Sequence, residues 1–212
     1  MYVGRIVAVG QTKSGRNTGM YRISSRSFPN RSTRLSANII SVVPKSGFEA
    51  DLTKNPYISY NCIKIAKNFT VISNGSHTDP IAEKIEMGYP VRDALSLALL
   101  AMDYEKDSYS TPRIAGVISF DSNIAYLASV AQKDLVVRAF NLERGFCFYV
   151  ATYEHSTPCS HYKDSAFDCS TASEARDYIF NKGIFANMEL PVTSAAAMSS
   201  ENGFELSAEL NA

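Results

Sequence analysis

The residues best suited to chemistry lie in Tyr21–Arg34 (YRISSRSFPNRSTR), which holds four arginines and four serines around a Phe-Pro-Asn turn. A guanidinium group donates paired hydrogen bonds to phosphate and stays charged, and serine hydroxyls can complete such a site. Pro29 stiffens the turn, so we expect Arg22, Arg26 and Arg31 to be held in place before a ligand arrives. The stretch predicts an anion-binding loop; a solvated basic hairpin is the alternative.

The charge of the chain is unevenly distributed. The formal net charge at pH 7 is 0, yet the first 48 residues carry eight basic side chains and no carboxylate, whereas the segment after Lys182 carries four glutamates and no base. A local basic region in a neutral protein favours one bound anion over general contact with polyanions. We therefore expect a small phosphorylated ligand and no nucleic acid. A module that binds RNA or a nucleotide without catalysis is the alternative, and the nearby aromatics Tyr2, Tyr21 and Phe28 would suit it.

A second candidate site is Met102–Asp107 (MDYEKD), where three acidic residues follow an apolar run. A carboxylate at the C-terminal end of a helix faces the negative end of the helix dipole, so its ionised form is disfavoured unless a cation lies nearby. This suggests that Asp103, Glu105 or Asp107 is held for proton transfer beside an arginine. The alternatives are a polar transition from helix to loop with Lys106 as a local partner, and a Mg²⁺ site.

Two amide-rich segments, NPYISYN and SNGSH, form a third candidate. Tyr60, Asn61 and Asn74 could bind ribose hydroxyls and base edges, because amides both donate and accept hydrogen bonds. The Asn-Gly pair at 74–75 is also typical of a turn. His77 could act as an acid or base, or simply orient the helix that follows.

The residue types that bind metals show no known metal-site spacing. His155, Cys159, His161 and Cys169 lack a zinc pattern, and the four cysteines form no CxxC pair. The chain also lacks the glycine-rich, esterase and zincin motifs. We therefore expect no metal, no cofactor and reduced cysteines.

Most of the elements that position these residues are predicted to be strands, because short β-rich runs are bounded by turn residues. The predicted strands are Tyr2–Val9, Met20–Ser24, Asn38–Val43, Tyr57–Ile65, Thr70–Ile72, Arg113–Ser119, Ile124–Val130, Leu135–Phe140 and Cys147–Tyr153. Capping signals predict helices from Asp79 to Gly88, Pro90 to Met102 and Thr171 to Gly183, and a fourth is considered over Pro191–Ser200. This pattern predicts an α+β fold in a single domain, 1–212, with Glu154–Ser173 as a surface excursion.

Membrane and export signals are weak. No apolar run reaches the roughly 18 residues of a membrane span, and the N-terminal segment lacks a signal-peptide pattern. We expect a cytoplasmic protein without a membrane partner.

Several long blocks, in the same order, resemble the archaeal-type IMP cyclohydrolases: MYVGRI, YRISSRSFPNR, NPYISYN, SNGSHTDPIAEKI and AMDYEKDSYSTPRIAG. The resemblance runs from Met1 to Gly116 and resumes at Val150–Glu154 and Leu190–Met198. It implies closure of 5-formamidoimidazole-4-carboxamide ribonucleotide (FAICAR) to inosine 5′-monophosphate (IMP) with loss of water, the last step of de novo purine synthesis. It also implies a four-layer αββα sandwich of the N-terminal-nucleophile-hydrolase type, with the pocket between two sheets. The family is not expected to use an N-terminal nucleophile, and the Met-Tyr start agrees.

The resemblance places the family's catalytic pair on Arg31 and Glu105. In the implied reaction Glu105 removes the carboxamide proton and returns one to the departing hydroxyl, while Arg31 stabilises the oxyanion. The proposed phosphate ligands are Arg22, Ser24, Arg26 and Ser27, the ribose and base contacts are Tyr60, Asn61 and Asn74, and the supporting residues are Asp103, Tyr104, Lys106 and Arg113. We expect FAICAR and IMP as the ligands and a homo-oligomer as the assembly. An amidohydrolase that acts on an external substrate through the same pair is a further alternative.

Overall fold

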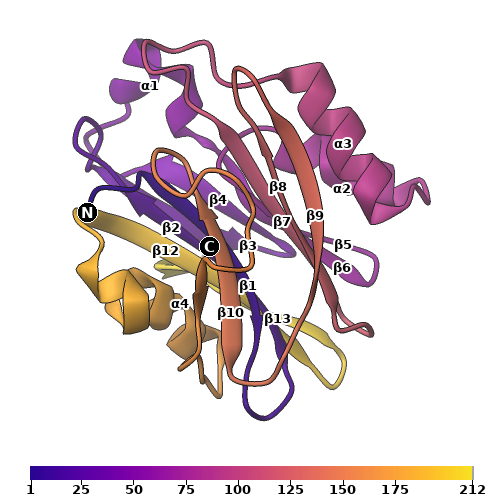
Figure 1. Cartoon of the computed structure of the whole chain (residues 1–212). Coiled ribbons are helices and arrows are strands. Elements are labelled where there is room, and N and C mark those ends of the chain that lie inside the picture. The colour runs from indigo at the N-terminus through magenta and orange to yellow at the C-terminus, as the bar shows by residue number, and fades with distance from the viewer. Residues whose placement is uncertain (212) are drawn as a thin grey trace.

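The computed structural model describes residues 1–211, in which two β-sheets face each other and helices cover their outer faces (Figure 1). The first sheet has six antiparallel strands, in the order β11 (Lys163–Asp164), β10 (Phe146–Ala151), β1 (Arg5–Gln11), β2 (Asn17–Ser24), β12 (Pro191–Ser200) and β13 (Gly203–Ser207).

The second sheet has eight strands, in the order β14 (Leu210–Asn211), β3 (Arg31–Ser36), β4 (Ile39–Pro44), β5 (Tyr60–Ala66), β6 (Phe69–Ser73), β7 (Arg113–Ser119), β8 (Ile124–Val130) and β9 (Leu135–Asn141). Its neighbours pair antiparallel except β14 and β3, which are parallel. Helix α1 (Asp51–Lys54) and the 3-10 turn η1 (Pro56–Ile58) lie between β4 and β5.

Strand alternation explains how the layers pack. In β1, Val7 and Val9 point into the core between the sheets, whereas Ile6 and Ala8 point to the opposite face, beneath α4 (Ala172–Asn181). The 3-10 turn η2 (Gly183–Asn187) completes that outer layer. The first sheet is therefore buried on both faces.

Two helices cover the outer face of the eight-stranded sheet (Figure 1). They are α2 (Thr78–Glu86) and α3 (Val91–Met102), and they begin and end within two residues of the predicted bounds. Helix α4 also begins as predicted, because the Thr171 side chain accepts a hydrogen bond from the amide of Glu174. No helix within residues 1–211 has the length and apolar character needed to cross a membrane.

The prediction of a fourth helix over Pro191–Ser200 is wrong, because this segment forms strand β12. It pairs with β2 on one side and β13 on the other, and Ala195–Met198 are buried on both faces. Ladder pairing and burial here outweigh the preference of alanine for helices. Strands β3, β11, β13 and β14 were not predicted.

The segment Glu154–Ser173, predicted as a surface excursion, consists mainly of turns with the two-residue strand β11. It is nevertheless anchored: Phe167 is fully buried, and the buried Asp164 accepts a hydrogen bond of 2.9 Å from the Tyr178 hydroxyl.

Candidate active site

A cavity of about 270 Å³ lies where the ends of the two sheets meet. Its walls come from the start of β1, the β2–β3 loop, the β4–β5 connection, the α3–β7 connection and the end of β10. The lining residues are Tyr2, Arg5, Ser25, Arg26, Ser27, Phe28, Arg31, Asn55, Tyr57, Ile58, Asp107, Tyr109 and Tyr153. Arginine side chains within a wall of tyrosines suit a planar ligand that carries an anion.

Arg5 enters the cavity because of its place in β1. It precedes Val7 and Val9 by an even number of residues and therefore shares their face, between the sheets. Its side chain is 12% exposed. Arg5 was not among the predicted site residues, although the same alternation in the N-terminal run would have indicated an arginine facing inward.

Arg22 lies on the opposite face. It pairs with Ile6 across the β1–β2 ladder and points toward the α4 layer. Its guanidinium donates to the carbonyl oxygens of Phe185, at 2.8 Å, and Met188, and burial lowers its pKa to about 10. Ser24 has the same parity and is also buried. Neither residue lines the cavity, so the structure does not bring Arg22 and Ser24 together with Arg26 and Arg31.

Three of the predicted catalytic and ligand-binding residues, Arg26, Ser27 and Arg31, do line the cavity, and so does Asp107, one of the three candidates for proton transfer. Arg26 and Ser27 are exposed in the β2–β3 loop, and the Arg26 guanidinium lies 4.1 Å from the ring centre of Tyr2. Arg31 begins β3 and is only 3% exposed. Its Nε donates a 3.0 Å hydrogen bond to the carbonyl of Phe28, and burial lowers its pKa. The cavity therefore has an exposed cation at its mouth and a buried one in its wall.

Glu105 lies directly behind Arg5. Its Oε2 accepts a 3.0 Å hydrogen bond from Nη2 of Arg5, and its Oε1 lies 3.8 Å from Nη1 of Arg113. The Glu105 side chain is 1% exposed. Burial raises the pKa of its carboxyl group, while the charges of Arg5 and Arg113 oppose that rise.

The segment that carries Glu105 is shaped by its own hydrogen bonds. Helix α3 ends at Met102, and the φ of 54° at the next residue, Asp103, turns the chain. The Asp107 carboxylate accepts hydrogen bonds from the amide of Thr111 at 2.9 Å and from its hydroxyl at 2.7 Å. The amide of Glu105 donates to the Thr111 carbonyl at 2.8 Å. These hydrogen bonds close the loop on itself.

Two tyrosines stand beside the cavity arginines. The hydroxyl groups of Tyr21 and Tyr60 are 2.5 Å apart, and burial raises the pKa of both. The charges of Arg5 and Arg31 lower the pKa of Tyr60 against that effect. Tyr60 is thus close to the two buried arginines, although it does not line the cavity.

The two predicted amide contacts have other partners. Asn61 points to the outer face of the sheet, where its amide donates to the carboxylate of Asp79 at 3.0 Å. The side chain of Asn74 accepts from the Ile114 amide at 2.7 Å and donates to the Pro112 carbonyl at 3.0 Å. Asn74 therefore ties the end of β6 to the start of β7, which carries Arg113.

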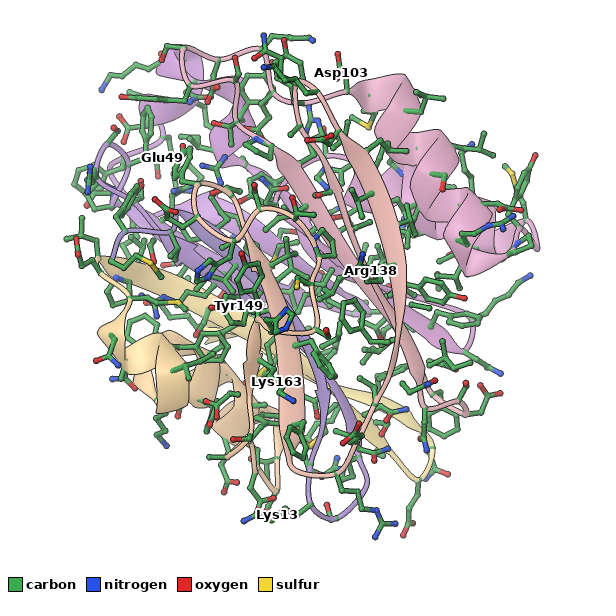
Figure 2. The ribbon with its side chains drawn as sticks, viewed as in Figure 1. Lys13, Glu49, Asp103, Arg138, Tyr149 and Lys163 are labelled. Atoms are coloured by element: carbon green, nitrogen blue, oxygen red, sulfur yellow. The ribbon has the colours of Figure 1, made fainter. Side chains whose placement is uncertain are left out.

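The remaining predicted residues contact one another near Asp103, which Figure 2 labels at the end of α3. Lys106 makes a salt bridge with Asp103 and lies 3.6 Å from the ring centre of Tyr104. Arg113 donates from Nε to the Asp103 carbonyl at 2.8 Å. Asp103 and Lys106 therefore support the loop from outside, while Arg113 reaches Glu105.

The basic residues of the N-terminal third do not all gather at the cavity. Lys13 lies at the opposite end of the molecule from Asp103 (Figure 2) and pairs with Asp168. The C-terminal glutamates meet some of the other bases: Arg16 pairs with Glu205 at 3.2 Å. The sequence asymmetry is thus partly cancelled in the fold, and the cavity keeps a local cluster of cations.

The His/Cys-rich segment does not assemble a metal site. His155 stacks on Tyr162 and bonds to the hydroxyl of Tyr149, which Figure 2 labels, while Cys159 contacts His161. Across residues 1–211, no three His, Cys, Asp or Glu side chains are grouped as metal binding requires.

Comparison with known proteins agrees with the sequence blocks. A family model described as IMP cyclohydrolase-like protein matches residues 2–203. The chain is 46% identical over 201 residues to the IMP cyclohydrolase of Methanosphaera stadtmanae, and the match covers 95% of this chain and 96% of the relative. It is 47% identical over 207 residues to that of Methanocella arvoryzae (97% and 96% covered) and 42% identical over 209 residues to that of Methanocaldococcus jannaschii (97% and 98% covered). The chain belongs to the IMP cyclohydrolase-like family.

Proposed function

We propose that this chain is an IMP cyclohydrolase that closes FAICAR to IMP with loss of water. The observation that carries the proposal is the pairing of a buried carboxylate of raised pKa, Glu105, with a cavity that holds the buried arginines Arg5 and Arg31. Relatives that match almost the full chain bear the name IMP cyclohydrolase.

The cavity supports a specific placement of the nucleotide. Arg26 and Ser27 at the mouth suit the phosphate, because both are accessible and one is charged. The aromatic walls at Tyr57 and Tyr109 suit the imidazole ring. The reacting formyl and carboxamide groups then reach the inner wall, near Arg31.

The reaction is intramolecular, because the nucleophile and the electrophile belong to one molecule, so the enzyme does not have to bring two reactants together. Holding the two groups in one plane can be worth roughly 7–11 kcal/mol in favourable intramolecular cases. Glu105 takes the proton from the carboxamide nitrogen as that nitrogen attacks the formyl carbon. Arg31 stabilises the negative charge on the formyl oxygen, a contribution of about 3–4 kcal/mol for a well-placed donor. Glu105 returns that proton to the oxyanion, which becomes a hydroxyl. A second proton, released from the formamide nitrogen as its C=N bond forms, lets the hydroxyl leave as water.

Arg5 controls access to the base. Its Nη2 donates a hydrogen bond to Oε2 of Glu105, and its side chain lines the cavity. We infer that the anionic or carbonyl oxygen of the bound nucleotide draws Arg5 away, which frees Oε2 to accept the substrate proton. This exchange couples ligand binding to activation of the base.

The finer architecture forms part of the proposal. Two facing sheets with helices on both outer faces support an αββα arrangement of the N-terminal-nucleophile-hydrolase type, with 1–212 acting as one domain. We also propose a homo-oligomer, which light scattering on the purified chain would test. The chemistry assigned to Glu105 and Arg31 requires no metal.

The test is to treat the purified protein with EDTA, add FAICAR and measure IMP by chromatography. The expected result is IMP formation by the wild type and its loss in Glu105→Gln. Release of formate in place of IMP would instead indicate an amidohydrolase. Tight IMP binding without turnover would indicate a nucleotide-binding protein.

A further inference from the structure

Three buried polar atoms converge around Gly75, next to the proposed base. They are Oε1 of Glu105, Nη1 of Arg113 and Nδ1 of His77, and none has a hydrogen-bond partner within residues 1–211. A Cβ atom added to Gly75 would lie 2.8 Å from Nη1, 3.2 Å from Nδ1 and 3.4 Å from Oε1. The three atoms thus surround a backbone position that carries no side chain.

The hydrogen-bonding roles of the three atoms are fixed by their other contacts. Nε2 of His77 lies 3.0 Å from the carbonyl oxygen of Ile114. A carbonyl can only accept, so Nε2 carries the ring hydrogen and Nδ1 is an acceptor. Oε1 of an ionised Glu105 is also an acceptor, and Nη1 of Arg113 is a donor. Nη1 and Oε1 are 3.8 Å apart, too far for a direct hydrogen bond.

Two acceptors and one donor are the complement of a single water molecule, which has two hydrogens to donate and lone pairs to accept. Buried polar atoms without partners are costly, which favours a shared partner at this position. We propose that a buried water molecule against Gly75 donates to His77 and Glu105 and accepts from Arg113, and that His77 is a positioning residue for the carboxylate. The proposal rests on the proposed function only where it treats Glu105 as the base.

The water gives the ionised carboxylate a hydrogen bond on the side away from the cavity. Oε1 is then held from behind, while Oε2 remains able to exchange between Arg5 and substrate. The charged and titratable groups that face Glu105 are Arg5 from β1, Arg113 from β7, His77 at the start of α2 and Asp107 from its own loop. Burial and the charge of Arg113 lower the pKa of His77 to about 3, so the ring stays neutral and Nδ1 remains an acceptor near pH 7.

The direct test is a crystal structure of the full chain at a resolution that shows ordered water, for the wild type and for Gly75→Ala. We expect a water within hydrogen-bonding distance of the three atoms in the wild type and its displacement in the variant. Direct contact between Arg113 Nη1 and Glu105 Oε1, with no water between them, would overturn the proposal.

A matched pair of variants separates positioning from a purely structural role. His77→Asn keeps an acceptor near the Nδ1 position and loses the donor to Ile114, whereas His77→Gln keeps the donor and loses the acceptor. The readout is the titration midpoint of Glu105, followed by NMR of the ¹³C-labelled glutamate carboxyl. We expect His77→Gln to raise the midpoint by about one pH unit and His77→Asn to leave it near the wild-type value. A raised midpoint in His77→Asn with an unchanged midpoint in His77→Gln would show that only the hydrogen bond from Nε2 to the Ile114 carbonyl matters, and it would refute the proposal.

The titration needs no turnover, so its result is independent of the IMP assay. If Glu105→Gln still makes IMP while the water and the titration behave as described, the assignment of the base fails and the water site stands. If IMP formation depends on Glu105 and no water is found, the water site fails alone.

Discussion

Nη2 of Arg5 and Oε2 of Glu105 are 3.0 Å apart, although 100 positions separate the two residues in the chain. One partner lines the cavity and the other is 1% exposed behind it. Arg5 thus connects the cavity to the carboxylate of Glu105. This contact leads to predictions for turnover and for its pH dependence.

The first prediction concerns the base itself. Glu105→Gln keeps the shape of the side chain but removes its ability to take a proton, so turnover should fall at least about a hundredfold. IMP affinity should stay within about tenfold, because an amide oxygen can still accept from Arg5. Steady-state kinetics and calorimetric titration with IMP would measure the two effects. Normal turnover in the variant would mean that the base lies elsewhere.

The second prediction concerns pH. The charge of Arg5 lowers the pKa of Glu105 against the effect of burial, so Arg5→Met should raise that pKa. A base acts when it is ionised, and kcat/KM reports the free enzyme, in which Arg5 still contacts Glu105. The acid limb of the kcat/KM profile should therefore move to higher pH in the variant. Arg16→Met is a suitable control, because Arg16 pairs with Glu205 and does not line the cavity. An unchanged acid limb in Arg5→Met would contradict the coupling.

The third prediction concerns the mouth of the cavity. Arg26→Ala should weaken binding of IMP by roughly tenfold to a hundredfold, the value of a hydrogen bond to a charged group. Because Arg26 is exposed, the urea midpoint of unfolding should change little. Equal affinity of the variant and the wild type for IMP would mean that the phosphate binds in another part of the cavity.

The fourth prediction concerns Arg22, for which we expect a loss of stability without a loss of substrate binding. Arg22→Met leaves the buried carbonyls of Phe185 and Met188 without their donor, which should lower the free energy of unfolding by about 2 kcal/mol or more. KM of the folded variant should remain close to that of the wild type. A large rise in KM with unchanged stability would instead support the phosphate role expected from the sequence.

The fifth prediction concerns acid stability. The pKa of His77 is lowered to about 3 in the fold, compared with about 6.5 in an unfolded chain. The unfolded state therefore binds the extra proton first, and stability is lost as pH falls from 6.5 toward 3. At pH 5 the loss is about 2 kcal/mol relative to pH 7. Urea unfolding at the two pH values, in wild type and His77→Gln, would isolate this contribution; an equal loss in both would exclude His77 as its source.

Much of the fold was predictable from alternation and turn residues. The strands Arg113–Ser119 and Ile124–Val130 match the structure at both ends, because each is a β-rich run between polar turns. Pro191–Ser200 could not be assigned in the same way, since its small residues fit a helix or a strand. The neighbours β2 and β13 decide the outcome, and β2 is distant in sequence.

The site was harder to predict than the fold. Residue type identified Arg31 as a ligand candidate, and the structure places it in the cavity wall. Strand alternation puts Arg22 and Ser24 on the same face of β2, but it does not show that α4 covers that face. The same rule applied to β1 would have favoured Arg5, whose face looks inward. What was missing was the order of the layers, which depends on packing between distant segments.

The contacts of Arg22 also bear on how sequences of this family can vary. Its acceptors are main-chain carbonyl oxygens, which every residue type provides. Substitutions at positions 185 and 188 can therefore preserve the contact, while a replacement of the arginine cannot. Across relatives, Arg22 should be as invariant as the cavity arginines although it does not line the cavity. The invariant arginines of the family would thus include some that are kept for ligand binding and some that are kept for stability. Only their positions in the fold tell the two groups apart.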